Sequence, residues 1–67
     1  MTFKLYDHVR IKKNGLYGQI IDITSGKNGA LLYTVESDTK GYRDDSDYPG
    51  VWPMYNCIGT EIEKAYD

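Results

Sequence analysis

Residues 8–13, His-Val-Arg-Ile-Lys-Lys, alternate between apolar and polar side chains, and an Asn-Gly pair comes directly after them. A period of two indicates a strand with one buried face, which here carries Val9 and Ile11. Asn14-Gly15 is the strongest short turn signal, because both residue types tolerate a positive φ. This pattern predicts a strand that turns back at once into a second strand.

Two more strands are expected in residues 18–23 and 30–37, joined by a Gly-rich turn at residues 24–29. In the first of them, the adjacent Ile20 and Ile21 break strict alternation, which indicates a bulge. Three strands joined by two short turns form a meander. The residues expected on one face of the third strand are Leu31, Tyr33 and Val35.

The second half of the chain is less regular. Residues 38–50 are polar and rich in Asp, and they predict a long acidic loop. Residues 51–55 predict a short aromatic strand, in which Pro53 must sit at an edge or a bend because it cannot donate a hydrogen bond. Residues 56–60 are expected to turn the chain into a last segment, 61–66.

The last segment allows two structures. Thr60 and Glu63 have the spacing of a helix capping box. The alternation of Ile62 and Lys64 with glutamates equally suits a strand, and we favour the strand because it would cover the open edge of a small sheet. The fold expected is therefore all-β, with residues 1–67 forming one domain, a small closed or nearly closed barrel of five strands.

The 67 residues contain a single cysteine, Cys57, so no internal disulfide can form. With His8 as the only histidine, a four-ligand zinc site of Cys and His is also excluded, and neither metal nor cofactor is expected. The lack of disulfides favours a reducing cytoplasm. No apolar stretch approaches the about 20 residues of a membrane span, so no membrane association is expected.

The residues of the first three strands resemble the KOW-like and Tudor-like SH3-type barrels of bacteria, over about half of the chain. In those barrels a Val-Arg-Ile strand, a Gly-ended turn, a Gly-x-Ile-x-x-Ile strand and a Tyr-x-Val strand follow one another. The resemblance implies a five-stranded SH3-like barrel that binds protein, RNA or DNA, and the short chain also resembles accessory proteins of bacterial mobile elements. The matching residues are Val9, Ile11, Gly15, Gly18, Ile20, Ile23, Tyr33 and Val35.

Seven tyrosines exceed what a core of this size needs, since each buried hydroxyl needs a partner. Tyr33 and one of Trp52 and Tyr55 are expected in the core. The others favour a non-enzymatic module that binds a protein or peptide, one rich in Lys or Arg by charge complementarity and cation–π contact. The candidate aromatic surface is Tyr42, Tyr48, Trp52 and Tyr55, and the candidate acidic loop beside it is Asp38, Asp44, Asp45 and Asp47.

Charge leaves other functions open. Residues 1–30 hold five Lys or Arg against two Asp, a balance of +3, whereas residues 31–67 hold three against eight acidic residues, a balance of −5. Net acidity argues against a dedicated nucleic-acid binder, but a nucleic-acid-associated module using the basic first hairpin stays an alternative, as does a structural or dimerising accessory protein. The candidate nucleic-acid residues are Arg10, Lys12, Lys13, Tyr17 and Lys27.

An enzyme is not expected. Cys57 and His8 could act as nucleophile and base, but no third residue that would orient them is marked in the sequence. A lone cysteine in a small domain is usually a buried apolar residue.

Overall fold

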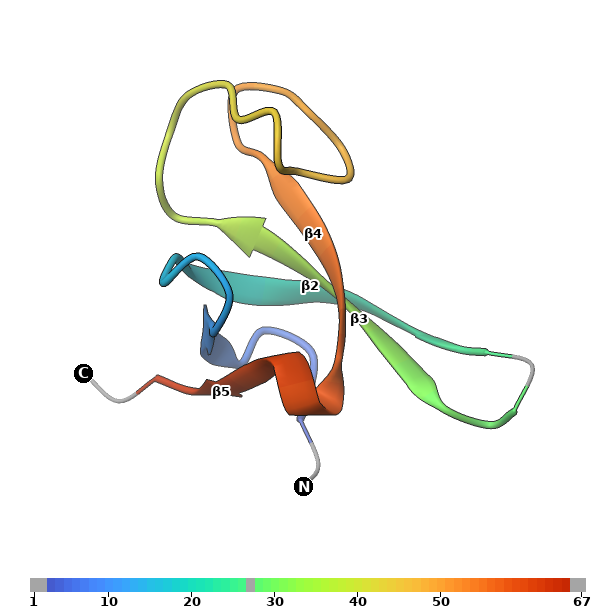
Figure 1. The fold of residues 1–67 in the computed structure, drawn as a ribbon. Helices are drawn as coiled ribbons and strands as arrows, with labels where there is room; N and C mark the ends of the chain where they lie inside the picture. Colours follow the sequence, from blue (N-terminus) through green and yellow to red (C-terminus); the bar gives the residue numbers. More distant parts are fainter. Residues whose placement is uncertain (1–2, 27, 66–67) are drawn as a thin grey trace.

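The computed structural model describes residues 3–26 and 28–65. They form an all-β domain with five antiparallel strands in one sheet, which confirms the expected class and number of strands (Figure 1). The strand order is β4-β3-β2-β1-β5. The elements are β1 (His8–Ile11), β2 (Tyr17–Ser25), β3 (Leu31–Ser37), β4 (Met54–Ile58), a 3-10 turn (Gly59–Glu61) and β5 (Ile62–Lys64).

The first turn forms as the Asn-Gly pair predicts. Gly15 has a φ of 75°, and its amide donates to the carbonyl of Ile11 at 2.8 Å. The side chain of Asn14 accepts a hydrogen bond from the amide of Leu16 at 3.0 Å. Asn14 thus supplies a local partner for the backbone, which is the usual reason for Asn in tight turns.

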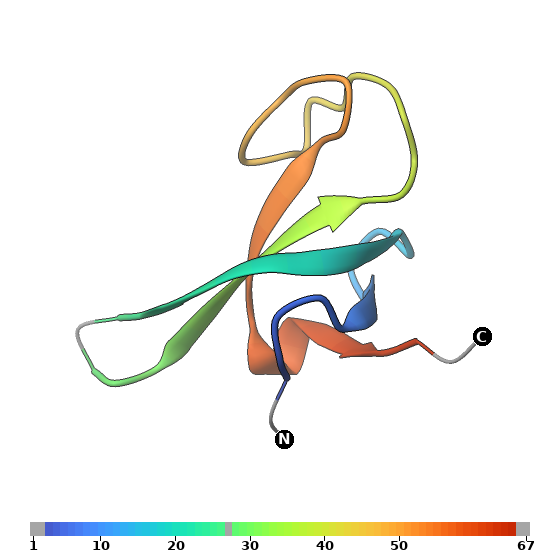
Figure 2. The same cartoon turned by 180° about the vertical axis from the view of Figure 1, so that it is seen from behind.

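The bulge expected at the two isoleucines is present. Ile20 pairs with Val35 and Asp22 with Thr34, so Ile21 is an extra residue on β2. Beyond this bulge, the hairpin of β2 and β3 projects from the molecule as an arm, and β4 stays paired with its β3 side as far as Leu32 (Figures 1 and 2). The arm is bare on its β2 side because the ladder between β1 and β2 ends at the pair His8 and Gln19.

One core joins all five strands. Tyr33 and Tyr55 are buried, and Trp52 is 46% exposed, so Tyr33 and Tyr55 fill the two expected aromatic core positions. Phe3 packs edge-on against Tyr33 with 5.4 Å between ring centroids. The buried apolar residues are Phe3, Val9, Ile11, Ile20, Tyr33, Val35, Tyr55, Cys57 and Ile62. Since edge strands β4 and β5 contribute to the same core, the sheet curls around it.

The fourth strand begins three residues later than predicted. Residues 56–58 continue the ladder with β3 instead of turning, and Pro53 lies just before the strand. The prediction was wrong because the alternation that matters is Tyr55 and Cys57, which both point into the core. The carbonyl of Pro53 accepts the amide of Ser37 at 2.9 Å, and the ring of Pro53 is fully buried.

The favoured strand at the C-terminal end is confirmed for Ile62–Lys64, which pairs with β1. The capping box at Thr60 and Glu63 does not form. Instead Glu61 accepts the amide of Ile58 at 2.8 Å, at the start of the single 3-10 turn. In the described part of the chain, no helix is long and apolar enough to cross a membrane.

Gly18 provides the first test of this packing. A Cβ atom there would lie 2.7 Å from Cγ1 of Val35 and closer still to the carbonyl of Glu36. We expect Gly18→Ala to lower the free energy of unfolding by about 2 kcal/mol or more, as overpacking of a dense core does. Gly50→Ala is the matched control, because nothing lies within 4 Å of its Cβ position. Equal urea midpoints for the two variants would contradict the register of β2 and β3.

Candidate functional site

The long loop between β3 and β4 is held by backbone hydrogen bonds. The amide of Gly41 donates to the carbonyl of Val51 at 2.7 Å and closes the loop upon itself. Tyr48 and Met54 exchange two hydrogen bonds of 3.2 Å, so the loop returns alongside the start of β4 (Figure 1). The loop therefore has a defined path despite its lack of strands.

Asp45 connects this loop to the core and to the first hairpin. Its carboxylate accepts the hydroxyl of Tyr55 at 2.7 Å and the guanidinium of Arg43 at 3.1 and 3.3 Å. Asn14 donates to it at 3.4 Å. The Arg43 guanidinium and the Tyr55 hydroxyl lower the pKa of Asp45 to about 2. Burial, together with the neighbouring Asp45 carboxylate, raises the pKa of Tyr55.

Asp47 and Glu61 cover the outer edge of β4. The amide of Asn56 donates to Asp47 at 2.8 Å, and the amide of Ile58 donates to Glu61 at 2.8 Å. The amide of Met54 already has the carbonyl of Tyr48 as its acceptor. Every second amide along this edge strand thus has a partner, which blocks the pairing of another chain.

The remaining acidic candidates differ from each other. The carboxylate of Asp38, which follows β3, lies 2.7 Å from Nε2 of His8 on β1. Asp44 is exposed and makes no hydrogen bond or ion pair with any residue that the structure describes. Among the predicted acidic residues, Asp38, Asp45 and Asp47 therefore have structural partners, and Asp44 is the one directed to solvent alone.

The aromatic candidates divide in the same way. Tyr42 is 73% exposed, and Tyr48 and Trp52 are each nearly half exposed. Tyr55 is fully buried, so its ring cannot be part of a surface, and the prediction that it belongs to the aromatic surface was wrong. Sequence reasoning missed Val51, which is 58% exposed. The sequence feature that could have indicated it is its position next to Trp52, in a short segment between two prolines.

The basic candidates do not form one patch. Arg10 pairs with Glu63 at 3.3 Å, and Lys13 lies over the ring of Tyr55 at 5.5 Å. Tyr17 faces Arg10 across the first hairpin, and its ring stacks on that of His8. Lys12 belongs to a separate groove. Lys27 lies outside the described residues.

Cys57 and His8 have different surroundings. Burial raises the pKa of the Cys57 thiol to about 11, so the thiolate that a nucleophile needs is scarce at neutral pH. His8 lies on the outer side of the sheet, next to Tyr17 and Asp38. Within residues 3–26 and 28–65, no three His, Cys, Asp or Glu side chains are grouped to hold a metal ion.

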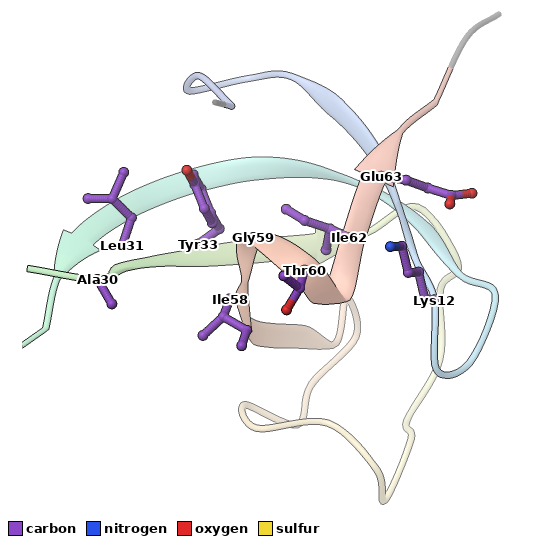
Figure 3. Close-up of a pocket in the computed structure, with 9 residues that line it drawn as sticks. All are labelled: Lys12, Ala30, Leu31, Tyr33, Ile58, Gly59, Thr60, Ile62 and Glu63. Atoms are coloured by element: carbon purple, nitrogen blue, oxygen red, sulfur yellow. The ribbon is translucent and has the colours of Figure 1, made fainter. Parts of the chain in front are cut away.

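A groove of about 700 Å³ lies under the base of the arm, where β3 passes the 3-10 turn (Figure 3). Sequence reasoning missed this groove, because its apolar wall includes Leu31 and Ile58. These two side chains lie outside the buried core and are 42% and 47% exposed. Its lining residues are Lys12, Ala30, Leu31, Tyr33, Ile58, Gly59, Thr60, Ile62 and Glu63.

Comparison of the chain with protein-family models, with curated proteins and with solved structures finds no match. The function of the chain therefore has to follow from the chemistry of its own surfaces.

The bonds of Asp45 predict a specific dependence of stability on pH. A carboxyl whose pKa falls on folding, here from 3.8 to about 2, stabilises the folded state above its usual pKa, and this stabilisation is lost as the pH falls through the lower value. We expect Asp45→Asn to lower the urea midpoint at neutral pH, and the difference from wild type to shrink between about pH 4 and about pH 2.

Asp44→Asn is the matched control for this titration, because it removes the same charge without removing a bond. A wild-type protein and an Asp45→Asn variant with parallel midpoints across this pH range would show that Asp45 lacks the bonds described above.

Proposed function

We propose that the protein is a non-enzymatic binding module whose long loop contacts a protein or peptide partner. The observation that carries this proposal is a group of large apolar side chains exposed on a loop with a fixed backbone. The group, called the loop surface below, is Tyr42, Tyr48, Val51 and Trp52.

Two physical arguments support the loop surface as an interface. Tyr and Trp are enriched among the residues that dominate binding energy, because they bury much area at small cost in side-chain entropy. A loop whose backbone is already held loses little further entropy on binding. The hydrogen bonds of Gly41 and Tyr48 provide that restraint.

The partner we propose carries Lys or Arg, but charge contributes little to its affinity. Of the acidic residues in the loop, Asp45 and Asp47 are already hydrogen-bonded within the protein, and Asp38 is next to His8. Asp44 and the faces of the aromatic rings remain to attract a cation. Binding should therefore respond more to loss of Trp52 than to added salt.

The fold supports this type of function. We propose that the curled sheet is an SH3-like barrel of the KOW-like or Tudor-like kind. The three-stranded meander, the 3-10 turn before β5 and the pairing of β5 with β1 support that assignment. Such barrels act as binding modules, although the fold alone does not determine what they bind.

Nucleic acid is the less favoured ligand. Arg10 already pairs with Glu63, and Lys13 lies over Tyr55, which leaves fewer free cations on the first hairpin than the sequence suggests. The second half of the chain, which includes the loop surface, has a net charge of −5, and phosphate-binding surfaces are basic.

Trp52→Ala tests the proposal. Titration of the labelled protein with a panel of Lys- and Arg-containing peptides should shift amide signals of residues 38–56. Trp52→Ala should weaken that binding about tenfold or more, as loss of an interface hot spot does. Tyr6→Ala is the matched control, because Tyr6 is 67% exposed but lies outside the loop.

Two results would contradict the proposal. One is a set of peptide-induced shifts that lies entirely outside residues 38–56. The other is equal affinity of Trp52→Ala and wild-type protein for the same peptide, with Tyr6→Ala as reference.

A further inference from the structure

The groove under the arm has one apolar end and one polar end. Ala30 and Leu31 of the arm lie at one end, and Lys12 and Glu63 lie at the other (Figure 3). Between them, the buried Tyr33 and Ile62 form the floor of the groove. Its volume of about 700 Å³ is in the range of small-molecule sites, which are mostly apolar with a few polar groups that orient the ligand.

The two charges at the polar end are not equivalent. The carboxylate of Glu63 points away from the other lining residues (Figure 3), and it pairs with Arg10 at 3.3 Å. This pair follows from the register of the sheet, where Arg10 and Glu63 are directly opposite each other on β1 and β5. The negative charge of the groove rim is therefore already balanced.

Lys12 provides the unbalanced charge. Its ammonium group points toward the groove (Figure 3), and it forms no ion pair with any residue of the described ranges. The nearby Glu61 is occupied by the amide of Ile58 at 2.8 Å. A cation beside an apolar floor attracts an anion, and the low polarity of the floor strengthens that attraction relative to bulk water.

We propose that this groove is a binding site for a small apolar monocarboxylate. The apolar body of the ligand lies on Leu31, Tyr33 and Ile58, and its carboxylate meets the ammonium group of Lys12. This site is separate from the loop surface, so either proposal can fail without the other.

The test uses 4-phenylbutyrate and its uncharged amide, 4-phenylbutyramide, which differ only at the carboxyl group. Titration of the labelled protein with the carboxylate should shift the amide signals of Leu31, Tyr33 and residues 58–62. The amide should bind about fivefold or more weakly, the order of effect of one partly exposed ion pair.

Lys12→Gln should reduce the affinity for 4-phenylbutyrate to that of the amide and leave the affinity for the amide unchanged. Lys40→Gln, the same change at an exposed loop residue outside the groove, should bind both compounds as wild type does. Leu31→Asp should abolish binding of the carboxylate, and thermal unfolding checks that each variant is folded.

Three outcomes would overturn the proposal. They are signal shifts confined to residues outside the groove, equal affinity for the carboxylate and the amide, and equal affinity of folded Lys12→Gln and wild-type protein for the carboxylate.

Discussion

The hydrogen bond from the buried Tyr55 to Asp45 connects the core of the sheet to the long loop between β3 and β4. The ring of Tyr55 fills the core, and its hydroxyl needs a partner at the point where the core ends. Asp45 supplies that partner and also binds Arg43 and Asn14, from the loop and from the first turn. A chain of 67 residues has few large side chains for its core, so this bond serves packing and loop position together.

The acidic loop has a structural explanation in the same terms. The carboxylates of Asp47 and Glu61 accept outward-pointing amides of β4, and the side chain of Asp22 accepts the amide of Ile23 on the bare side of the arm. Acidic side chains thus occupy backbone donors along β4 and on the β2 side of the arm, where another strand would otherwise pair. The loop is acidic in part because the sheet needs acceptors, and the side chains left for a partner are mainly aromatic.

The sequence predicted the local features of the fold. Alternation predicted the first three strands, the Asn-Gly pair predicted the first turn, and the adjacent isoleucines predicted the bulge. These features could be predicted because each of them depends only on residues that are neighbours in the sequence. The limits of β4 and the roles of Tyr55 and Leu31 depend on contacts between distant segments. Alternation placed Leu31 on the same face as Tyr33, but the arm extends beyond the core, so the same face is exposed there and becomes part of a groove.

The long loop is held in place before any partner binds, and amide hydrogen exchange is the measurement that tests this. The amides of Gly41 and Asn56 are the decisive probes, because they donate to Val51 and Asp47 within this region. We expect both amides to exchange much more slowly than unprotected amides. Exchange of both at the unprotected rate, while the amides of β2 and β3 stay protected, would contradict it.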